Sequence, residues 1–198
     1  MARKSKAFLH IGPNPSGLHA LHDELAEHAD LLSTVDLALP PVEASLLEAA
    51  GHEMLRDHKA ADLKRKDVEG AWAKVSRRAA KTKSDVVITQ ARFHVATGDQ
   101  IELILHALGG FDVHVVITPG DDDENDIAAT LAAHWSQHLP SKQVLISSLS
   151  DDAAAVDLAE NLVGLALCTQ KQQLDDRIAK LKKRRKIVRR KIDLLDAS

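Results

Sequence analysis

The chain contains no tyrosine, a single cysteine and few aromatic residues of any kind. With an aromatic content of only 3%, the core must be built from aliphatic side chains, and platforms on which nucleic-acid bases stack are scarce. The one cysteine, Cys168, excludes an internal disulfide and is expected to pack within an apolar helical stretch. No apolar run approaches the roughly 20 residues that cross a bilayer. These absences favour a cytoplasmic protein with an aliphatic core and no membrane partner.

The formal net charge of -3 conceals a contrast between the two ends of the chain. From Lys171 onward there are 11 of the 26 Lys and Arg residues but only 4 of the 29 Asp and Glu residues. The rest of the chain therefore holds 15 basic and 25 acidic residues, so the C-terminal segment is basic and the remainder is acidic. We expect the two parts to meet different partners.

Short apolar runs alternate with helical patterns over the first three quarters of the chain. Residues 7–11, 86–89, 113–118 and 144–146 are short apolar runs typical of parallel strands that are covered on both faces. Thr97 and Gln100 form a capping box that starts a helix, and two further helical stretches are expected between residues 42 and 82. This alternation predicts an α/β fold, a parallel sheet flanked by helices, for a first domain over residues 1–150.

Residues 151–198 are predicted to form a second unit, a long basic helix. The segment from 151 to 196 has no proline and one glycine, Gly164. Its second half has a heptad seam, interrupted by one arginine, that predicts a coiled coil: Leu174, Ile178, Leu181, Arg185, Val188, Ile192 and Leu195. These are the predicted interaction residues, through which the chain would form a homo-oligomer or bind another protein.

Residues 6–25 have the frame of a phosphate-binding loop, with an apolar strand, two glycines and an amphipathic helix. In such loops a lysine and a hydroxyl residue follow the second glycine, whereas Leu18 and His19 follow it here. The candidate cofactor-binding residues are therefore reduced to Gly12, Ser16, Gly17 and His19. They offer backbone amides and one hydroxyl, without the usual positive charge.

The order of three motifs resembles the bacterial, chiefly actinobacterial, branch of the sulfotransferase family. FLHIG at residues 8–12 is similar to the family's opening strand, and DVVITQARF at 85–93 to the strand that supplies its catalytic base. FDVHVVITPGDDD at 111–123 resembles the segment that grips the 3′-phosphate, and Trp135 follows as in the family. The resemblance implies a P-loop-like fold and 3′-phosphoadenosine-5′-phosphosulfate as cofactor.

The residues that carry the chemistry of that family are replaced. Pro15 stands at the loop lysine, Gln90 and Ala91 at the base, and Gly120 at the phosphate-binding arginine, ahead of an acidic run at residues 121–124. An amide cannot take up a proton near neutral pH, and the acidic run repels an anion. The resemblance with these gaps implies a catalytically inactive sulfotransferase-like domain with no catalytic residues and no cofactor. Such a chain would act as a binding or assembly module through its C-terminal helix.

Three alternatives remain open. In a transferase with a reduced phosphosulfate site, Ser16, backbone amides and His19 would replace the missing charges. The basic residues between 180 and 191 would also suit a nucleic-acid contact. A zinc site can be drawn from His10, His19, His22 and His28, although surface or half-buried histidines are the simpler interpretation, and no metal is expected.

Overall fold

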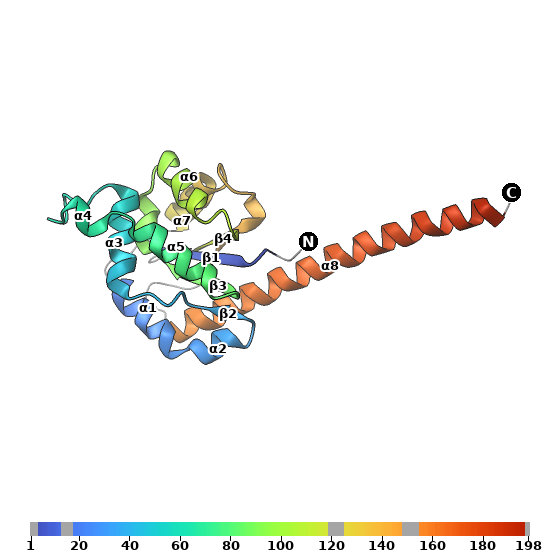
Figure 1. Cartoon of the computed structure of the whole chain (residues 1–198), viewed down its shortest axis with the longest axis horizontal. Coiled ribbons are helices and arrows are strands. Elements are labelled where there is room, and N and C mark those ends of the chain that lie inside the picture. Colours follow the sequence, from blue (N-terminus) through green and yellow to red (C-terminus); the bar gives the residue numbers. More distant parts are fainter. Residues whose placement is uncertain (1–3, 13–17, 119–124, 148–154, 197–198) are drawn as a thin grey trace.

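The computed structural model describes residues 4–12, 18–118, 125–147 and 155–196. Its centre is a sheet of parallel strands in the order β2-β3-β1-β4-β5 (Figure 1). The strand bounds are Lys6–Ile11 for β1, Leu37–Ala38 for β2, Asp85–Thr89 for β3, Asp112–Ile117 for β4 and Val144–Ile146 for β5. The prediction of an α/β fold with a parallel sheet flanked by helices and a long C-terminal helix is confirmed.

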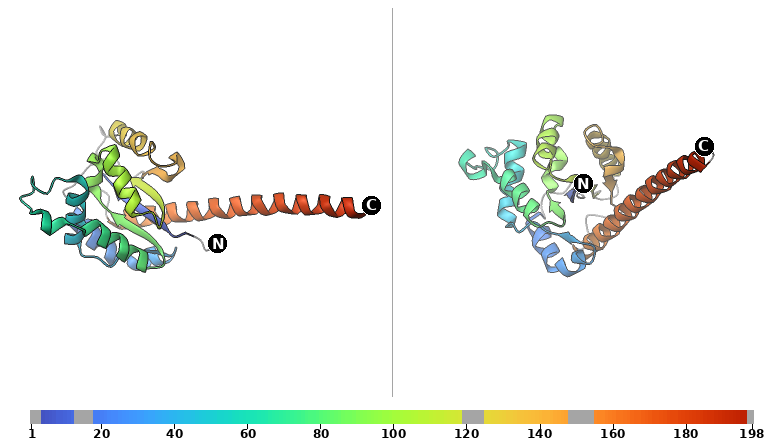
Figure 2. Two further views of the ribbon diagram at one scale, coloured as in Figure 1. Left: turned by 45° about the horizontal axis from the view of Figure 1, so that its top comes forward. Right: turned by 45° about the vertical axis from the view of Figure 1, so that its right-hand side comes forward.

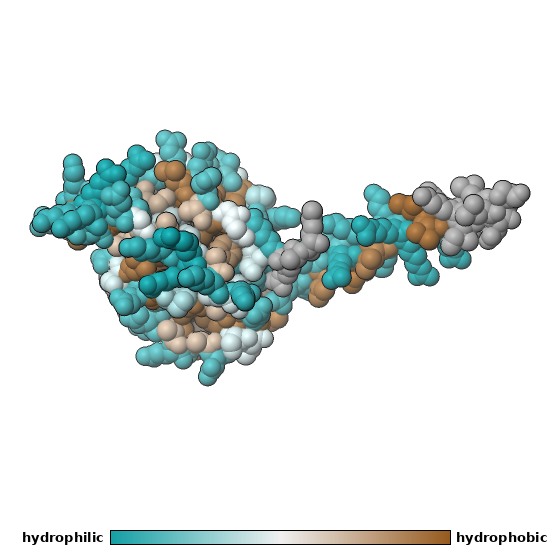
Figure 3. Space-filling model, viewed as in Figure 1, coloured by the Kyte–Doolittle hydropathy of each residue, from teal (hydrophilic) through white to brown (hydrophobic). Residues whose placement is uncertain are grey.

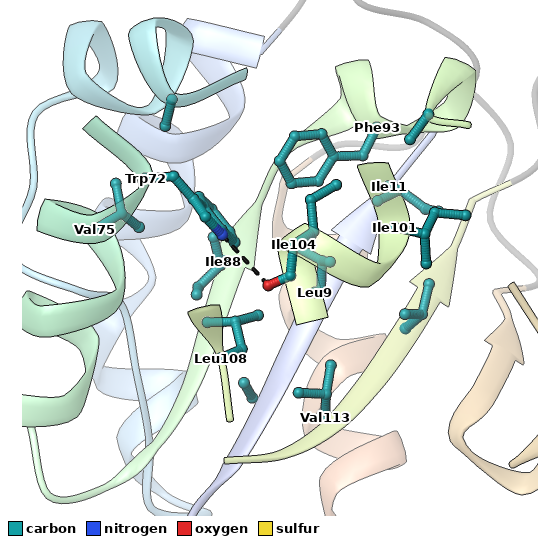
Figure 4. Packing of buried hydrophobic residues seen from close by; sticks show 14 of the residues in the cluster. Leu9, Ile11, Trp72, Val75, Ile88, Phe93, Ile101, Ile104, Leu108 and Val113 are labelled. Carbon is teal, nitrogen blue, oxygen red and sulfur yellow. Dashed lines mark hydrogen bonds between the residues drawn. The ribbon is translucent and has the colours of Figure 1, made fainter. Parts of the chain in front are cut away.

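Within the described residues, one face of the sheet is covered by four helices, of which two precede β3, one follows β3 and one follows β4. These are α3 (Ala44–Leu55), α5 (Ala71–Lys81), α6 (Gly98–Ala107) and α7 (Asn125–Trp135). Leu9 and Ile11 of β1 point into this layer, where the rings of Trp72 and Phe93 pack edge to face at 5.3 Å (Figure 4). The Trp72 indole nitrogen donates to the carbonyl of Ile104 at 3.4 Å, and most of the other side chains in this layer are aliphatic.

The opposite face is covered by α1 (Leu18–Glu27), α2 (Ala29–Ser33) and the first turns of α8 (Ala155–Asp196) (Figure 2). Phe8 of β1 belongs to this layer because side chains alternate between the faces along a strand. Leu158, Leu162 and Ala166 of α8 are buried against it. The start of α8 therefore completes the core of the α/β domain.

A buried polar joint holds α8 where it leaves the body. Lys6 is fully buried, and its ammonium group donates to the hydroxyl of Thr169 at 2.7 Å. Its backbone amide donates to the Asp85 carboxylate at 2.8 Å. One residue beyond Thr169, the Gln170 amide donates to the carbonyl of Val35 at 3.1 Å. These contacts fix the direction in which the rest of α8 projects.

Helix starts are fixed partly by nearby residues and partly by distant ones. The Thr97 amide donates to the Gln100 side chain at 2.8 Å, as the capping box at the start of α6 predicts. At α5 the cap comes from α3, because the two oxygens of Glu53 accept from the amides of Gly70 and Trp72 at 2.6 and 2.7 Å. Gly70 has a φ of +79°, a backbone conformation that favours glycine.

Some short elements have no counterpart among the predicted ones. The edge strand β2, α4 (Arg65–Val68) and the 3-10 helices η1 (Ala91–Val95) and η3 (Ser141–Gln143) are each five residues or shorter. A segment of that length carries no periodic pattern that would distinguish it from a loop. The predicted loop positions Pro15, Ser16 and Gly17, and Gly120 with the acidic run, lie outside the described residues.

Candidate functional sites at the strand ends and on the C-terminal helix

The carboxyl end of β1 is where a parallel sheet of this kind offers a crevice. The helices after β1 cover one face of the sheet, while those after β3 and β4 cover the other, and ligands bind where connections diverge in this way. Beside β1, the Gln90 amide donates to the His10 carbonyl at 2.8 Å and the Thr118 amide to the Ile11 carbonyl at 3.0 Å. We call His10, Thr89, Gln90 and Thr118 the strand-end cluster.

His10 is the central titratable group of this cluster. Its Nε2 lies 2.8 Å from the Thr118 hydroxyl, whereas its Nδ1 has no hydrogen-bond partner among the described residues. Burial lowers the pKa of His10 from 6.5 to about 4, because a charged ring is poorly solvated there. Thr89, whose Cα pairs with that of His10, is also buried with an unpartnered hydroxyl. The cluster therefore offers neutral polar groups at neutral pH.

Gln90, at the position of the base in the sulfotransferase resemblance, is directed onto α3. Its amide nitrogen donates to the Leu47 carbonyl at 2.6 Å, and the side chain is fully buried. A Cβ on Gly51 would lie 3.0 Å from the Gln90 side-chain oxygen, so α3 and the end of β3 are closely packed. Gln90 thus joins a helix to the sheet and offers no basic group to a substrate.

Arg92 is a cation near this edge, and its guanidinium is already paired. It donates to Asp57 in the loop after α3, and the same carboxylate lies 2.7 Å from the Nδ1 of His52. Both partners of Asp57 are largely or fully buried. The group therefore fixes the loop after α3 to η1, and one guanidinium nitrogen of Arg92 is committed to Asp57.

Gly12 is the one member of the predicted cofactor loop whose surroundings the structure describes. Its φ is outside the left-handed region, and a Cβ there would lie 3.7 Å from the Thr118 carbonyl, an ordinary contact. The described geometry thus has no steric need for glycine at position 12. Ser16 and Gly17 lie outside the described residues, as does the side chain of His19.

The zinc site that can be drawn from the histidines in the sequence, although no metal is expected, is not assembled among the described residues. His10 is engaged with Thr118, and the Nε2 of His22 lies 3.2 Å from the Val42 carbonyl. Within the described ranges, no group of three His, Cys, Asp or Glu side chains is placed to hold a metal ion. Likewise, no described helix is both long and apolar enough to span a bilayer.

The projecting segment of α8, residues 171–196, is the second candidate site. Figures 1 and 3 show it extending away from the body, and at 1.5 Å per residue it is about 39 Å long. Every residue from 171 to 189 is exposed. Four predicted seam residues form what we call the apolar stripe, and their exposed fractions are 58% for Leu174, 48% for Ile178, 54% for Leu181 and 55% for Val188.

An exposed leucine precedes the apolar stripe on the part of α8 that is packed against the body. Leu167 lies seven residues before Leu174 and is 50% exposed, so it continues the row of Leu174, Leu181 and Val188 toward the body. An open groove of about 700 Å³ lies at the point of departure, between residues 33–36 of the body and Gln170, Gln173, Leu174 and Arg177 of α8. An open groove therefore lies beside Leu174, the first residue of the stripe.

Basic side chains surround the apolar stripe. In the heptad of the seam, Arg177, Lys182, Arg184 and Arg189 occupy the positions that flank it, and Arg185 lies within it. All five are exposed. Residues 177–191 contain ten Lys or Arg and no Asp or Glu. The surface thus combines aliphatic contact area with dense positive charge.

No protein-family model matches this chain, and no curated protein matches it. The resemblance to sulfotransferases therefore stays a prediction. What the fold and the two sites define is an α/β protein with a neutral strand-end cluster and a projecting basic helix that carries an apolar stripe.

Sequence reasoning singled out the seam of the C-terminal helix but missed the strand-end cluster. His10 and Thr118 are 108 residues apart, and only the pairing of β1 with β4 brings them together. One available signal was that Thr89 and Thr118 each end a predicted apolar run and that His10 is the last but one residue of another. Polar residues at such ends meet at one edge of a parallel sheet.

Proposed function

We propose that this protein is a non-catalytic binding and assembly module, in which the α/β domain displays α8 and the projecting segment binds the partner. The observation that carries the proposal is the apolar stripe, four half-exposed aliphatic side chains on a helix segment that extends away from the body. Large apolar groups aligned in this way favour association with another apolar surface.

The physical gain from covering the stripe is sufficient for a specific contact. Burying the remaining exposed half of each aliphatic side chain contributes about 1 kcal/mol. In a pair of identical helices, eight such side chains would be covered, and the contact would stabilise two helices that are marginal alone. The segment itself has few internal supports, one being the pair of Lys171 and Asp175 at 3.0 Å.

The chemistry of the strand-end cluster supports a non-catalytic role for the body. Sulfotransfer from an anionic cofactor requires positive charge and a base, whereas His10 is neutral and Gln90 is bonded to α3. We therefore expect calorimetric titration with adenosine 3′,5′-bisphosphate to give no heat of binding. A saturable heat would instead favour the alternative of a transferase with a reduced site.

The test of assembly compares the full chain with a chain that ends at Gln170, by size-exclusion chromatography with light scattering. At about 1 M NaCl the Debye length falls to about 3 Å, which screens the repulsion between basic helices. We expect the full chain to self-associate there as its concentration rises, and the shortened chain to stay monomeric. A full chain that is monomeric at every concentration and salt, and that also fails to bind a copy with reversed charges beside the stripe, would refute the proposal.

A nucleic-acid contact is the second candidate, favoured by the ten basic residues between 177 and 191. Such a contact would lose affinity steeply with salt, because each neutralised phosphate releases counterions. It would also be insensitive to substitution in the apolar stripe. Retention of duplex or single-stranded DNA by a Leu181→Asp variant as strongly as by the natural chain would favour this candidate.

A further inference from the structure

The partner of the projecting segment is defined by its charge as well as by its apolar stripe. Resting on the proposed function above, we propose that the segment binds an acidic amphipathic helix of another protein, with aliphatic residues in its seam and Asp or Glu at the flanks. A second copy of this chain is the disfavoured partner at physiological salt.

Self-pairing brings basic groups against basic groups in the middle of the segment. In a parallel pair each g position faces the e position five residues later on the other helix. Arg177 would then face Lys182 and Arg184 would face Arg189, twice each by symmetry. In an antiparallel pair, basic side chains would again face one another where the basic stretches overlap, because residues 177–191 contain no acidic side chain. Like charges at these positions destabilise a helix pair.

Arg185, which lies within the seam, favours a partner with a carboxylate at the facing position. It occupies an a position and is exposed, so in a parallel pair of copies two guanidinium groups would meet within the apolar layer. A carboxylate at the facing position of the partner would neutralise it and form charge-assisted hydrogen bonds. The row of charges thus selects a partner whose acidic residues lie beside and within its own apolar seam.

The apolar stripe favours an acidic protein helix, rather than a nucleic acid, as the partner of the projecting segment. Phosphates cannot cover Leu174, Ile178, Leu181 and Val188, which are each about half exposed. The aromatic residues that would stack on bases all lie in the body, where they are buried: Phe8, Trp72, Phe93, Phe111 and Trp135. The groove of about 700 Å³ beside Leu174 and Arg177 gives the end of a partner helix a place to dock.

The probe for this proposal is a charge-reversed copy of the full chain. The flank-reversed copy carries R177E, K182E, R184E and R189E, which leave the apolar stripe unchanged. The matched control, the back-reversed copy, carries K180E, K183E, K186E and R190E, the same change of net charge at positions away from the seam. Circular dichroism verifies that both copies remain helical, and sedimentation equilibrium measures pairing with the natural chain.

At about 0.15 M salt we expect the natural chain to bind the flank-reversed copy about tenfold or more tightly than it binds itself or the back-reversed copy. The preference should shrink at about 1 M salt, where the flank charges are screened. Both results would support an acidic helix as the partner.

Three results would overturn the proposal that the partner is an acidic helix. Self-association at low salt as strong as pairing with the flank-reversed copy would remove the charge argument and leave the proposed assembly function standing. Equal binding to both reversed copies would show that the net charge of the helix drives the association and that the positions beside the seam have no special role. Retention of duplex DNA more tightly than the flank-reversed copy would make nucleic acid the partner. Absence of every one of these associations at any salt would remove the proposed function itself.

Discussion

His10 should make the folded protein sensitive to mild acid, and His10→Gln should remove that sensitivity. Its pKa is about 4 in the folded protein and 6.5 when unperturbed, because the buried ring resists a charge. Between these values the unfolded chain binds a proton that the folded chain does not, so stability is lost as pH falls. From about pH 7 to about pH 5 the loss due to His10 is about 2 kcal/mol.

Urea unfolding followed by tryptophan fluorescence measures this loss, since Trp72 and Trp135 are both buried. Gln at position 10 keeps a hydrogen-bonding group near Thr118 but does not titrate. The stability difference between the two pH values should therefore be about 2 kcal/mol smaller in His10→Gln than in the natural chain. Burial also lowers the pKa of His22 and His114, so part of the acid sensitivity remains in the variant.

The matched control is His106→Gln on the exposed surface of α6, which accounts for any general effect of the substitution. An acid-induced loss in His10→Gln equal to that of the natural chain would refute the reasoning. His10 would then be charged or solvated in the folded state, and the strand-end cluster could supply positive charge to an anion after all.

Three further predictions concern stability. Glu53→Ala removes a carboxylate that caps α5 and should cost about 2–4 kcal/mol, whereas the exposed Glu69→Ala should stay within about 0.5 kcal/mol; equal urea midpoints would contradict the cap. Leu162→Ala opens a cavity under the start of α8 and should cost about 2–5 kcal/mol by the same assay, and a loss below 1 kcal/mol would mean that α8 is loosely packed. Ending the chain at Gln170 should leave the melting temperature within about 2 °C, because residues 171–189 are exposed; a larger fall in a thermal melt would show that they support the body.

Much of the fold was predictable because its signals are local. The strands β1, β3, β4 and β5 are short, mainly apolar runs, and α6 begins at a capping box formed by neighbouring residues. The apolar seam of α8 is predicted by heptad spacing alone. Each of these signals lies within the segment that it describes.

The rest depends on contacts between distant parts of the chain. Lys6 reads as a surface residue, yet it is buried and bonded to Thr169, 163 residues away. The cap of α5 is supplied by Glu53 of α3, and the orientation of Gln90 is set by the carbonyl of Leu47. Such partners are chosen by tertiary packing, which no periodicity in the sequence encodes.

If the projecting segment binds through its apolar stripe, a charge placed within the stripe should abolish binding, whereas the same charge elsewhere on the helix should not. Leu181→Asp places a charge in the stripe, whereas Ile187→Asp makes the same kind of change at a similarly exposed aliphatic residue away from the seam. Sedimentation equilibrium at about 1 M NaCl, where charge repulsion is screened, reports self-association. The account predicts that Leu181→Asp is monomeric while Ile187→Asp associates like the natural chain. Equal association of the two variants would contradict it.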